Sequence, residues 1–169
     1  NSNLKMTYRL KRPVDIAGGL ALGVLTLPIQ LAVAGSIYLE GKINESYRRP
    51  LIYRAKRTGK DGKIFDMYKF SSMVDGADQD LEKLLGEYGE VNKIKNDPRI
   101  TPVGKIIRSL SFDELPQWVN VVKGQMSLVG ARPRSQEETM DLLAMGYKDV
   151  VEINPGLTSL ACIGGRKDL

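Results

Sequence analysis

The longest hydrophobic run lies near the beginning of the chain, from Ile16 to Leu39, and contains 24 residues without a formal charge. A run of this length can cross a bilayer as one straight helix. Pro28 lies in its middle, however, and a proline removes a helical hydrogen bond and bends the helix. The pattern therefore predicts two helical segments with a break at Pro28, where Thr26 and Gln30 are candidates to cap the freed backbone groups.

Basic residues lie on both sides of this hydrophobic segment. Those before it are Lys5, Arg9, Lys11 and Arg12, and those after it are Lys42, Arg48, Arg49, Arg54, Lys56 and Arg57. Because lysine and arginine mark the cytoplasmic side of a membrane segment, both ends are expected on the same face. A re-entrant helix–break–helix hairpin satisfies this pattern and a single span does not. The residues alone leave a spanning helix and a buried core helix open, whereas the run is too long for a signal peptide.

Two short runs rich in branched and aromatic residues follow, at 51–56 and 64–70, on either side of a glycine-containing turn at 58–62. This arrangement predicts a β-hairpin. The next segment, 75–95, is strongly charged, and its leucines fall on one face of a helix. We therefore expect an amphipathic helix there.

Two further helices are indicated by their end signals. Thr101-Pro102 is typical of an N-cap followed by the first helical position, so a helix is expected to run from there to about Leu110. A second helix is expected over 113–123, because Gly124 follows it and glycine commonly ends helices.

The last part of the chain alternates between strand and helix signals. Residues 126–129 predict a short buried strand. Residues 135–147 predict a helix, because Ser135 and Glu138 have the spacing of a capping box. The expected fold class is α+β, mostly helical, with amphipathic surface helices, a small β-hairpin and an N-terminal re-entrant helix–break–helix hairpin.

Composition narrows the chemistry. The 169 residues are 42% hydrophobic and 27% charged, as is typical of globular chains. The net charge of +5 suits an anionic partner such as phosphate groups or acidic lipid headgroups. The single cysteine, Cys162, excludes an intrachain disulfide and a metal site built on cysteines. The absence of histidine excludes Ser/His, Cys/His and His-ligated zinc mechanisms, so catalysis must use carboxylates, Lys, Arg, Tyr, Ser or a bound cation.

Two adjacent carboxylates, Asp113 and Glu114, lie just before Pro116. A proline is tolerated only near the start of a helix, so both acids are expected in the first turn, where free amides and the helix dipole lower their pKa values. Their mutual repulsion is relieved by a neighbouring arginine or by Mg²⁺, which binds hard oxygen ligands. The alternative is purely structural, with Ser111 and Glu114 forming a capping box.

The basic residues around this pair favour the chemical interpretation. Arg108 precedes the carboxylates by about one helical turn, and Arg132 and Arg134 follow Gly130, which permits close approach of the backbone. Carboxylates and converging arginines are typical of phosphoryl transfer. A glycosidase is excluded, because its two carboxyl groups must be several ångströms apart.

Longer motifs occur along the chain in a fixed order. They are Lys11-Arg12-Pro-Val-Asp15, Tyr68-Lys-Phe70, Asn96-Asp-Pro-Arg-Ile-Thr101, Ile107-Arg-Ser-Leu-Ser-Phe-Asp-Glu-Leu-Pro-Gln117, Asn120-Val-Val-Lys-Gly124, Met126-Ser-Leu-Val-Gly130, Arg132-Pro133 and Pro155-Gly-Leu-Thr158. In this order they resemble the bacterial sugar transferases, the monotopic phosphoglycosyl transferases that initiate glycoconjugate assembly. The resemblance covers nearly the whole chain, and its most specific part is the Asp-Glu-Leu-Pro-Gln run.

This resemblance implies Mg²⁺-dependent transfer of a sugar-1-phosphate from a UDP-sugar to polyprenol phosphate, with release of UMP. It also implies a re-entrant membrane helix over 1–40 and a catalytic domain over 41–169. That domain is expected on the cytoplasmic face of the bacterial cytoplasmic membrane, in contact with inner-membrane lipids. No nucleic-acid partner is expected. The oligomeric state and the transferred sugar do not follow from the sequence.

The resemblance also assigns roles to residues. Asp113 is expected to be the nucleophile that carries a covalent phosphosugar, and Glu114 to hold the metal with Asp113 or to move a proton. Arg108, Arg132, Arg134 and Lys69 are the expected substrate-binding residues. Asp15 is expected to form a cap or an ion pair with Arg12.

Some positions depart from the family pattern. Leu27-Pro28 replaces the usual Ser-Pro at the helix break, so the hydroxyl of Thr26 is expected to substitute. Ser71, Ala131 and Cys162 stand where the family has arginine, proline and glutamine. Members of the family also continue beyond the Gly165-Arg166 pair, and whether the C-terminus is truncated does not follow from the sequence. The rival to an enzyme is a membrane-anchored scaffold or lipid-binding protein without catalysis.

Overall fold

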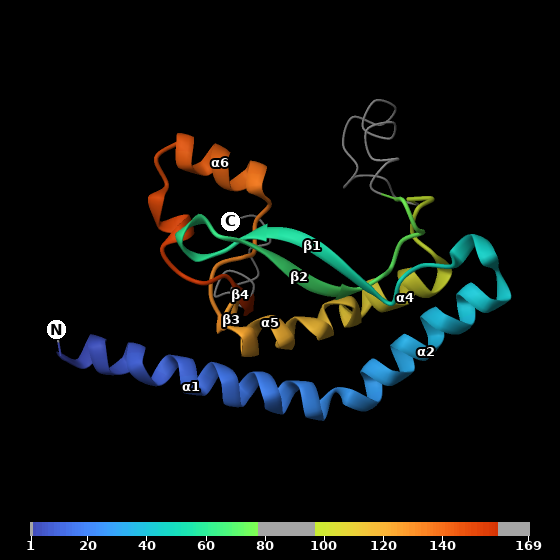
Figure 1. The fold of residues 1–169 in the computed structure, drawn as a ribbon, viewed down its shortest axis with the longest axis horizontal. Coiled ribbons are helices and arrows are strands. Elements are labelled where there is room, and N and C mark those ends of the chain that lie inside the picture. The colour runs from blue at the N-terminus through green and yellow to red at the C-terminus, as the bar shows by residue number, and fades with distance from the viewer. Residues whose placement is uncertain (1, 78–96, 159–169) are drawn as a thin grey trace. The chain divides into compact units, whose positions relative to one another are not determined.

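The computed structural model describes residues 2–77 and 97–158, and its parts form two compact units (Figure 1). Unit 1 comprises Asn1–Leu27, Arg54–Tyr68 and Pro116–Leu169, and unit 2 comprises Pro28–Tyr53 and Lys69–Leu115. Helices and small sheets are mixed, as the predicted fold class requires. The expected division into 1–40 and 41–169 stays a prediction.

Two helices form the N-terminal part, α1 over Ser2–Leu25 and α2 over Leu27–Ile43. The predicted break is confirmed, and it falls at Thr26, two residues before Pro28. The Thr26 amide and hydroxyl both donate to the Leu22 carbonyl, at 3.0 and 2.7 Å. Pro28 therefore lies in the first turn of α2, where its missing N–H costs no helical hydrogen bond.

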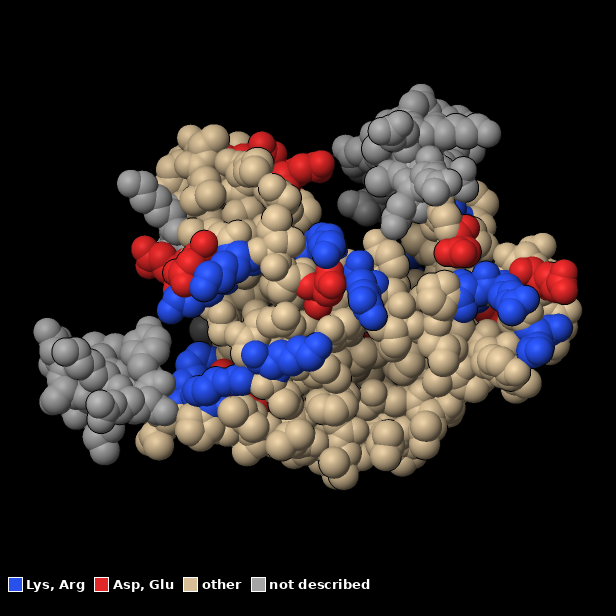
Figure 2. All heavy atoms as spheres, in the orientation of Figure 1, with Lys and Arg blue, Asp and Glu red and all other residues tan. Residues whose placement is uncertain are grey.

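The exposed side chains of these helices are apolar over long stretches. In α1, Val24 and Leu25 are 70% and 77% exposed. In α2, Leu31 and Leu39 are also exposed. The visible surface over the second half of α1 and over much of α2 carries no charge (Figure 2). No single described helix is long and apolar enough to cross a membrane, but the bent pair Leu10–Leu25 and Leu27–Ile43 meets that test by length and composition.

In unit 1, α1 packs along α5, which spans Trp118–Lys123, and against β3, which spans Ser127–Val129 (Figure 1). The contact with α5 is close at Gly23, where an added Cβ would lie 2.7 Å from the indole ring of Trp118. Gly124 ends α5 in a left-handed conformation with a φ of 83°, as predicted. The core of this unit contains Ala55, Phe65, Met67, Val121 and Met126.

The short strand β3 pairs in parallel with β4, Gly156–Thr158, with Ser127 opposite Gly156. The close backbone approach expected at Gly130 is present, because an added Cβ would lie 2.5 Å from the Asn154 carbonyl oxygen. The absence of a side chain at Gly130 therefore allows the backbone of residues 154–156 to pack closely against it.

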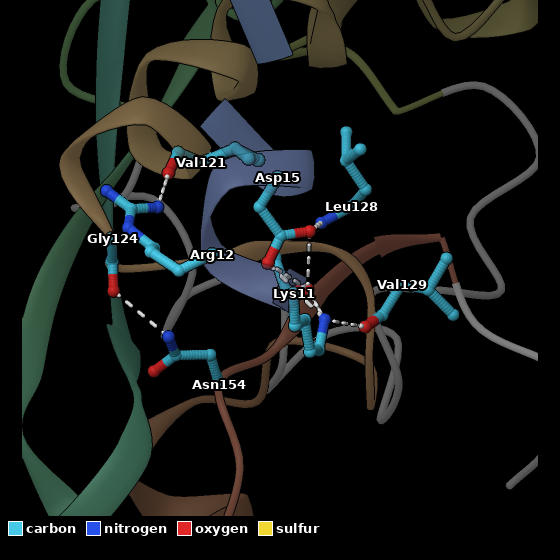
Figure 3. A network of polar contacts seen from close by, with 9 residues as sticks. Lys11, Arg12, Asp15, Val121, Gly124, Leu128, Val129 and Asn154 are labelled. Atoms are coloured by element: carbon cyan, nitrogen blue, oxygen red, sulfur yellow. Dashed lines mark hydrogen bonds and ion pairs between the residues drawn. The ribbon is translucent and has the colours of Figure 1, made fainter. Parts of the chain in front are cut away.

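Side chains of α1 tie this helix to the rest of unit 1 (Figure 3). The Asp15 carboxylate accepts hydrogen bonds from the Ser127 hydroxyl at 2.9 Å and from the Leu128 amide at 3.0 Å. Its ion-pair partner is Lys11 at 3.3 Å, so the predicted pairing with Arg12 is wrong. The Arg12 guanidinium instead donates to the carbonyls of Val121 and Val122, each at 2.6 Å, in the last turn of α5.

The predicted β-hairpin is confirmed. It consists of β1, Ile52–Thr58, and β2, Ile64–Phe70, joined through a short 3₁₀ turn at Lys60–Gly62. Along β2, Phe65, Met67 and Phe70 are buried.

The predicted helix after Ser135 is α6, Gln136–Ala144, and its capping box with Glu138 is present. Further 3₁₀ turns lie at Glu45–Tyr47 and Lys148–Val151. Most of the helix expected over 75–95 lies outside the described residues.

In unit 2, α4 spans Pro102–Ser109, and the Thr101 hydroxyl caps it by accepting from the Gly104 amide at 2.9 Å, as predicted. Ile107 of α4 packs with Val33, Ile37 and Phe70 in the core of this unit.

Just before α4, Asp97 and Arg99 form a buried ion pair, each 6% exposed. The Asp97 oxygens lie 2.7–3.2 Å from Arg99 nitrogens. The Asn-Asp-Pro-Arg motif thus has a structural role in holding this turn.

The single helix predicted over 113–123 is wrong in part. A 3₁₀ helix, η4, runs over Phe112–Gln117, and the α-helical part begins only at Trp118. Pro116 lacks the N–H that an α-helical bond to the fourth preceding carbonyl requires, so this stretch takes a different winding.

Candidate active site

The carboxylate pair is presented by a sharp turn after α4. Ser111 has a φ of 57°, and this left-handed residue redirects the chain into η4, whose first turn contains Asp113 and Glu114. The Ser111 amide donates to the Arg108 carbonyl at 3.1 Å and not to the Glu114 side chain. The capping-box interpretation of Ser111 and Glu114 is therefore wrong, and the acids are available for other contacts.

Lys69, at the end of β2, reaches both carboxylates. Its Nζ lies 2.8 Å from Glu114 Oε1 and 3.8 Å from Asp113 Oδ2. The Asp113 side chain is 14% exposed, whereas that of Glu114 is 45% exposed. The structure thus distinguishes the two acids: Glu114 is a partly solvated partner of lysine, and Asp113 is largely buried.

The pKa of Asp113 is raised above its usual value of 3.8. Burial is the largest cause, since it disfavours the charged form. The positive charge of Lys69 opposes this shift, the negative charge of Glu114 adds to it, and the positive charge of Arg108 opposes it. The sequence-based expectation that the helix start lowers the pKa is wrong for Asp113, because loss of solvent outweighs the nearby favourable charges.

The other predicted basic residues lie in different places. Arg108 is exposed in the last turn of α4, in the same unit as Asp113. Arg132 and Arg134 belong to unit 1, where Arg132 is exposed and the carbonyl of Arg134 accepts from the Thr58 amide at 3.0 Å. The structure therefore brings Asp113, Glu114, Lys69 and Arg108 together, and the assignment of the other two arginines stays a prediction.

The carboxylate oxygens of Asp113 and Glu114 are of the donor type that a hard cation such as Mg²⁺ prefers. Among the described residues, no group of three or more His, Cys, Asp or Glu side chains could hold a metal by itself. Asp113 and Glu114 provide two carboxylates, and Mg²⁺ is commonly bound by one or two carboxylates together with substrate phosphates and water. A buried carboxylate with a raised pKa is also the kind of group whose ionised form a cation stabilises.

One basic residue has a role that the sequence did not indicate. In the sequence, Arg49 is one of the basic residues that follow the hydrophobic segment, but its side chain is 0% exposed and pairs with Glu40 at 2.8 Å. It also donates to the carbonyl of Ser71, itself buried at 6% exposure. Arg49 is therefore not a surface charge for lipid headgroups. A signal for this was missing, because Glu40 and Arg49 are separated by a turn and lie in no recognised motif.

Chemically, this arrangement suits a reaction at a phosphate. A carboxylate oxygen with little solvation can act as a nucleophile or a base, and Lys69 and Arg108 provide positive charge near it. The approach of an anionic substrate would add negative charge, which these cations can compensate.

Residues 6–169 match the family model described as bacterial sugar transferase. Over 167 residues, the chain is 39% identical to an undecaprenyl-phosphate galactose phosphotransferase of Salmonella typhimurium, covering 95% of this chain and 33% of that protein. It is 39% identical to a UDP-glucose:undecaprenyl-phosphate glucose-1-phosphate transferase of Klebsiella pneumoniae, covering 92% and 31%. It is 32% identical to the exopolysaccharide production protein ExoY of Rhizobium meliloti, covering 94% and 74%. The chain spans about a third of the length of the first two of these relatives.

Proposed function

Since the chain belongs to the bacterial sugar transferase family, we propose that it moves a sugar-1-phosphate from a UDP-sugar to polyprenol phosphate and releases UMP. The observation that carries this proposal is the buried Asp113 carboxylate, with Glu114 and Lys69 beside it. The names of the relatives support the same reaction class, because they describe undecaprenyl-phosphate sugar phosphotransferases. The reaction begins glycan or polysaccharide assembly.

The proposed reaction has two displacements at the phosphorus that carries the sugar. An Asp113 carboxylate oxygen attacks this phosphorus, and the bond to the bridging oxygen of UMP breaks, so that UMP leaves with the electron pair. A phosphate oxygen of polyprenol phosphate then attacks the same phosphorus, and the bond to Asp113 breaks. The products are the polyprenol diphosphate-linked sugar and the free carboxylate, so the two steps balance without another reactant.

The neighbouring side chains have distinct roles in this scheme. Lys69 holds Glu114 by an ion pair and, with Arg108, compensates the charge of Asp113 and of the diphosphate. Arg132 and Arg134 bind the phosphates. Mg²⁺, held by Asp113 and Glu114, would neutralise charge on the diphosphate.

We further propose that the bent helix pair enters the cytoplasmic leaflet of the bacterial cytoplasmic membrane and returns to the same face. The exposed apolar side chains of α1 and α2 support this placement, as does the break at Thr26. A protein anchored in this way meets the lipid acceptor at the membrane surface, where the phosphate of the polyprenol lies.

The test is UMP release from a panel of UDP-sugars with polyprenol phosphate, with and without Mg²⁺. Asp113→Asn should lose turnover by several orders of magnitude, since removal of a covalent nucleophile leaves only binding and electrostatic effects. Asp141→Asn, at an exposed position of α6, is the matched control and should turn over normally. Mass spectrometry of the protein with donor alone should detect a sugar-phosphate adduct that Asp113→Asn does not form.

A folded, lipid-bound wild type that releases no UMP with any donor would instead favour the scaffold interpretation. That interpretation is supported only by the exposed apolar faces of α1 and α2. It predicts salt-sensitive binding to anionic vesicles and no covalent adduct.

A further inference from the structure

Unit 2 contains a second buried ion pair, formed by Glu40 at the end of α2 and Arg49 in the loop before β1. The closest atoms, Glu40 Oε2 and Arg49 Nη2, lie 2.8 Å apart, and the two side chains are 9% and 0% exposed. They meet as an ion pair without the alignment of a hydrogen bond. The two opposite charges compensate each other, and each side chain also forms hydrogen bonds with backbone groups.

The second oxygen of Glu40 holds the beginning of α4. Glu40 Oε1 accepts a hydrogen bond from the Val103 amide at 2.8 Å. Val103 lies in the first turn of α4, whose amides have no acceptor within the helix. A carboxylate is favoured there by the helix dipole as well. Glu40 and the Thr101 cap together fix the start of the helix that carries Arg108 in its last turn.

The other nitrogens of Arg49 hold the segment that follows β2. Arg49 Nε donates to the Ser71 carbonyl at 3.1 Å, and Nη1 donates to the Tyr47 carbonyl at 2.9 Å. Ser71 lies two residues after Lys69, the residue that contacts Glu114 and Asp113. The pair therefore binds both chain segments that bring a cation to the carboxylates.

We propose that Glu40 and Arg49 are a positioning pair, which holds the start of α4 and the end of β2 so that Arg108 and Lys69 face Asp113. This inference rests on the proposed transfer reaction for its catalytic consequence. A buried ion pair contributes little to stability compared with apolar residues of similar volume, but its hydrogen bonds are directional. Its consequence is geometric: small displacements of catalytic groups cost up to about 10²-fold in rate.

The test compares kcat and KM for UMP release among Glu40→Ala, Glu40→Gln, Arg49→Met and wild type, each well below its own melting temperature. Glu40→Ala and Arg49→Met should lower kcat by about 10²-fold and change KM by a smaller factor, because displaced Lys69 and Arg108 compensate charge less well in the transition state. Glu40→Gln keeps an acceptor for the Val103 amide and should lose less. Lys56→Gln removes a charge from an exposed pair with Asp66 and should match wild type.

A readout independent of activity is amide hydrogen exchange. Exchange at Val103 should accelerate in Glu40→Ala and stay unchanged in Lys56→Gln. Folded Glu40→Ala and Arg49→Met proteins with wild-type kcat would overturn the inference, and so would unchanged exchange at Val103.

If wild type releases no UMP at all, the proposed function fails, and exchange at Val103 alone then decides whether Glu40 holds α4. If Glu40→Ala does not fold, the kinetic comparison is made with Arg49→Met, which leaves the acceptor of the Val103 amide in place.

Discussion

The buried pair of Asp97 and Arg99 gives a quantitative prediction for stability. Both residues are 6% exposed, and they share several contacts of 2.7–3.2 Å. Asp97→Asn removes one charge and leaves the other buried, which typically costs about 3–5 kcal/mol. At about 2–4 °C per kcal/mol for a chain of this size, the melting temperature should fall by about 6–20 °C. Thermal unfolding followed by circular dichroism measures this directly.

The contribution of Asp97 to stability should depend on pH in a defined direction. The pKa of Asp97 is lowered from 3.8, chiefly by the hydrogen bonds from Arg99, while burial opposes the shift. A carboxylate whose pKa is lowered on folding stabilises the protein above its unfolded pKa, and this contribution is lost as pH falls through the folded value. The difference in melting temperature between wild type and Asp97→Asn should therefore be largest near neutral pH and narrow below pH 3.8.

A double-mutant cycle separates the pair from other effects. Asp97→Leu combined with Arg99→Met removes both charges, so it should cost much less than the sum of the single substitutions. Lys56→Gln, which removes a charge from an exposed pair, should have the same melting temperature as wild type. If the losses of the single variants simply add in the double variant, the unpaired buried charge is not the source of the destabilisation.

Three further outcomes follow from the site and its supports. Asp113→Asn should melt above wild type at pH 7, because the raised pKa of Asp113 means that its ionised form destabilises the fold, and the gain should vanish below pH 3.8, where both states are protonated. In pH profiles of turnover, Lys69→Met should move the acid limb to higher pH and Glu114→Gln should move it to lower pH; shifts in one common direction would contradict the charge assignment. Thr101→Ala should lower unfolding free energy by about 1 kcal/mol in denaturant titrations, while Thr101→Ser should preserve it.

Local features of the fold could be predicted from the sequence because their causes are local. The Thr101 cap, the Gly124 helix end and the Ser135 capping box each depend on residues within one turn of each other. The helix break was also predictable, since Pro28 acts on its own neighbours.

The environment of the carboxylates was not predictable in this way. Lys69 meets Glu114 across 45 positions in the chain, and Glu40 meets Val103 across 63. The motif alone makes Asp113 the candidate nucleophile, and this assignment stays a prediction. The direction of its pKa shift could not be predicted, because burial depends on how distant segments pack. The burial of Arg49 could not be predicted for the same reason, since the sequence does not distinguish an exposed flanking charge from a buried ion-pair partner.

The contact between α1 and α5 sets the register of the first helix. Asp15 follows Arg12 by three residues and Gly23 follows Asp15 by eight, which is two steps of four, so the three residues share one face of α1. At one end of this face, Arg12 and Asp15 bind specific backbone groups, and at the other end Gly23 leaves room for the Trp118 ring. Sliding α1 along α5 by one turn would remove both polar anchors. The polar groups therefore fix the position of α1 along α5, and the absence of a side chain at Gly23 allows the two helices to approach closely.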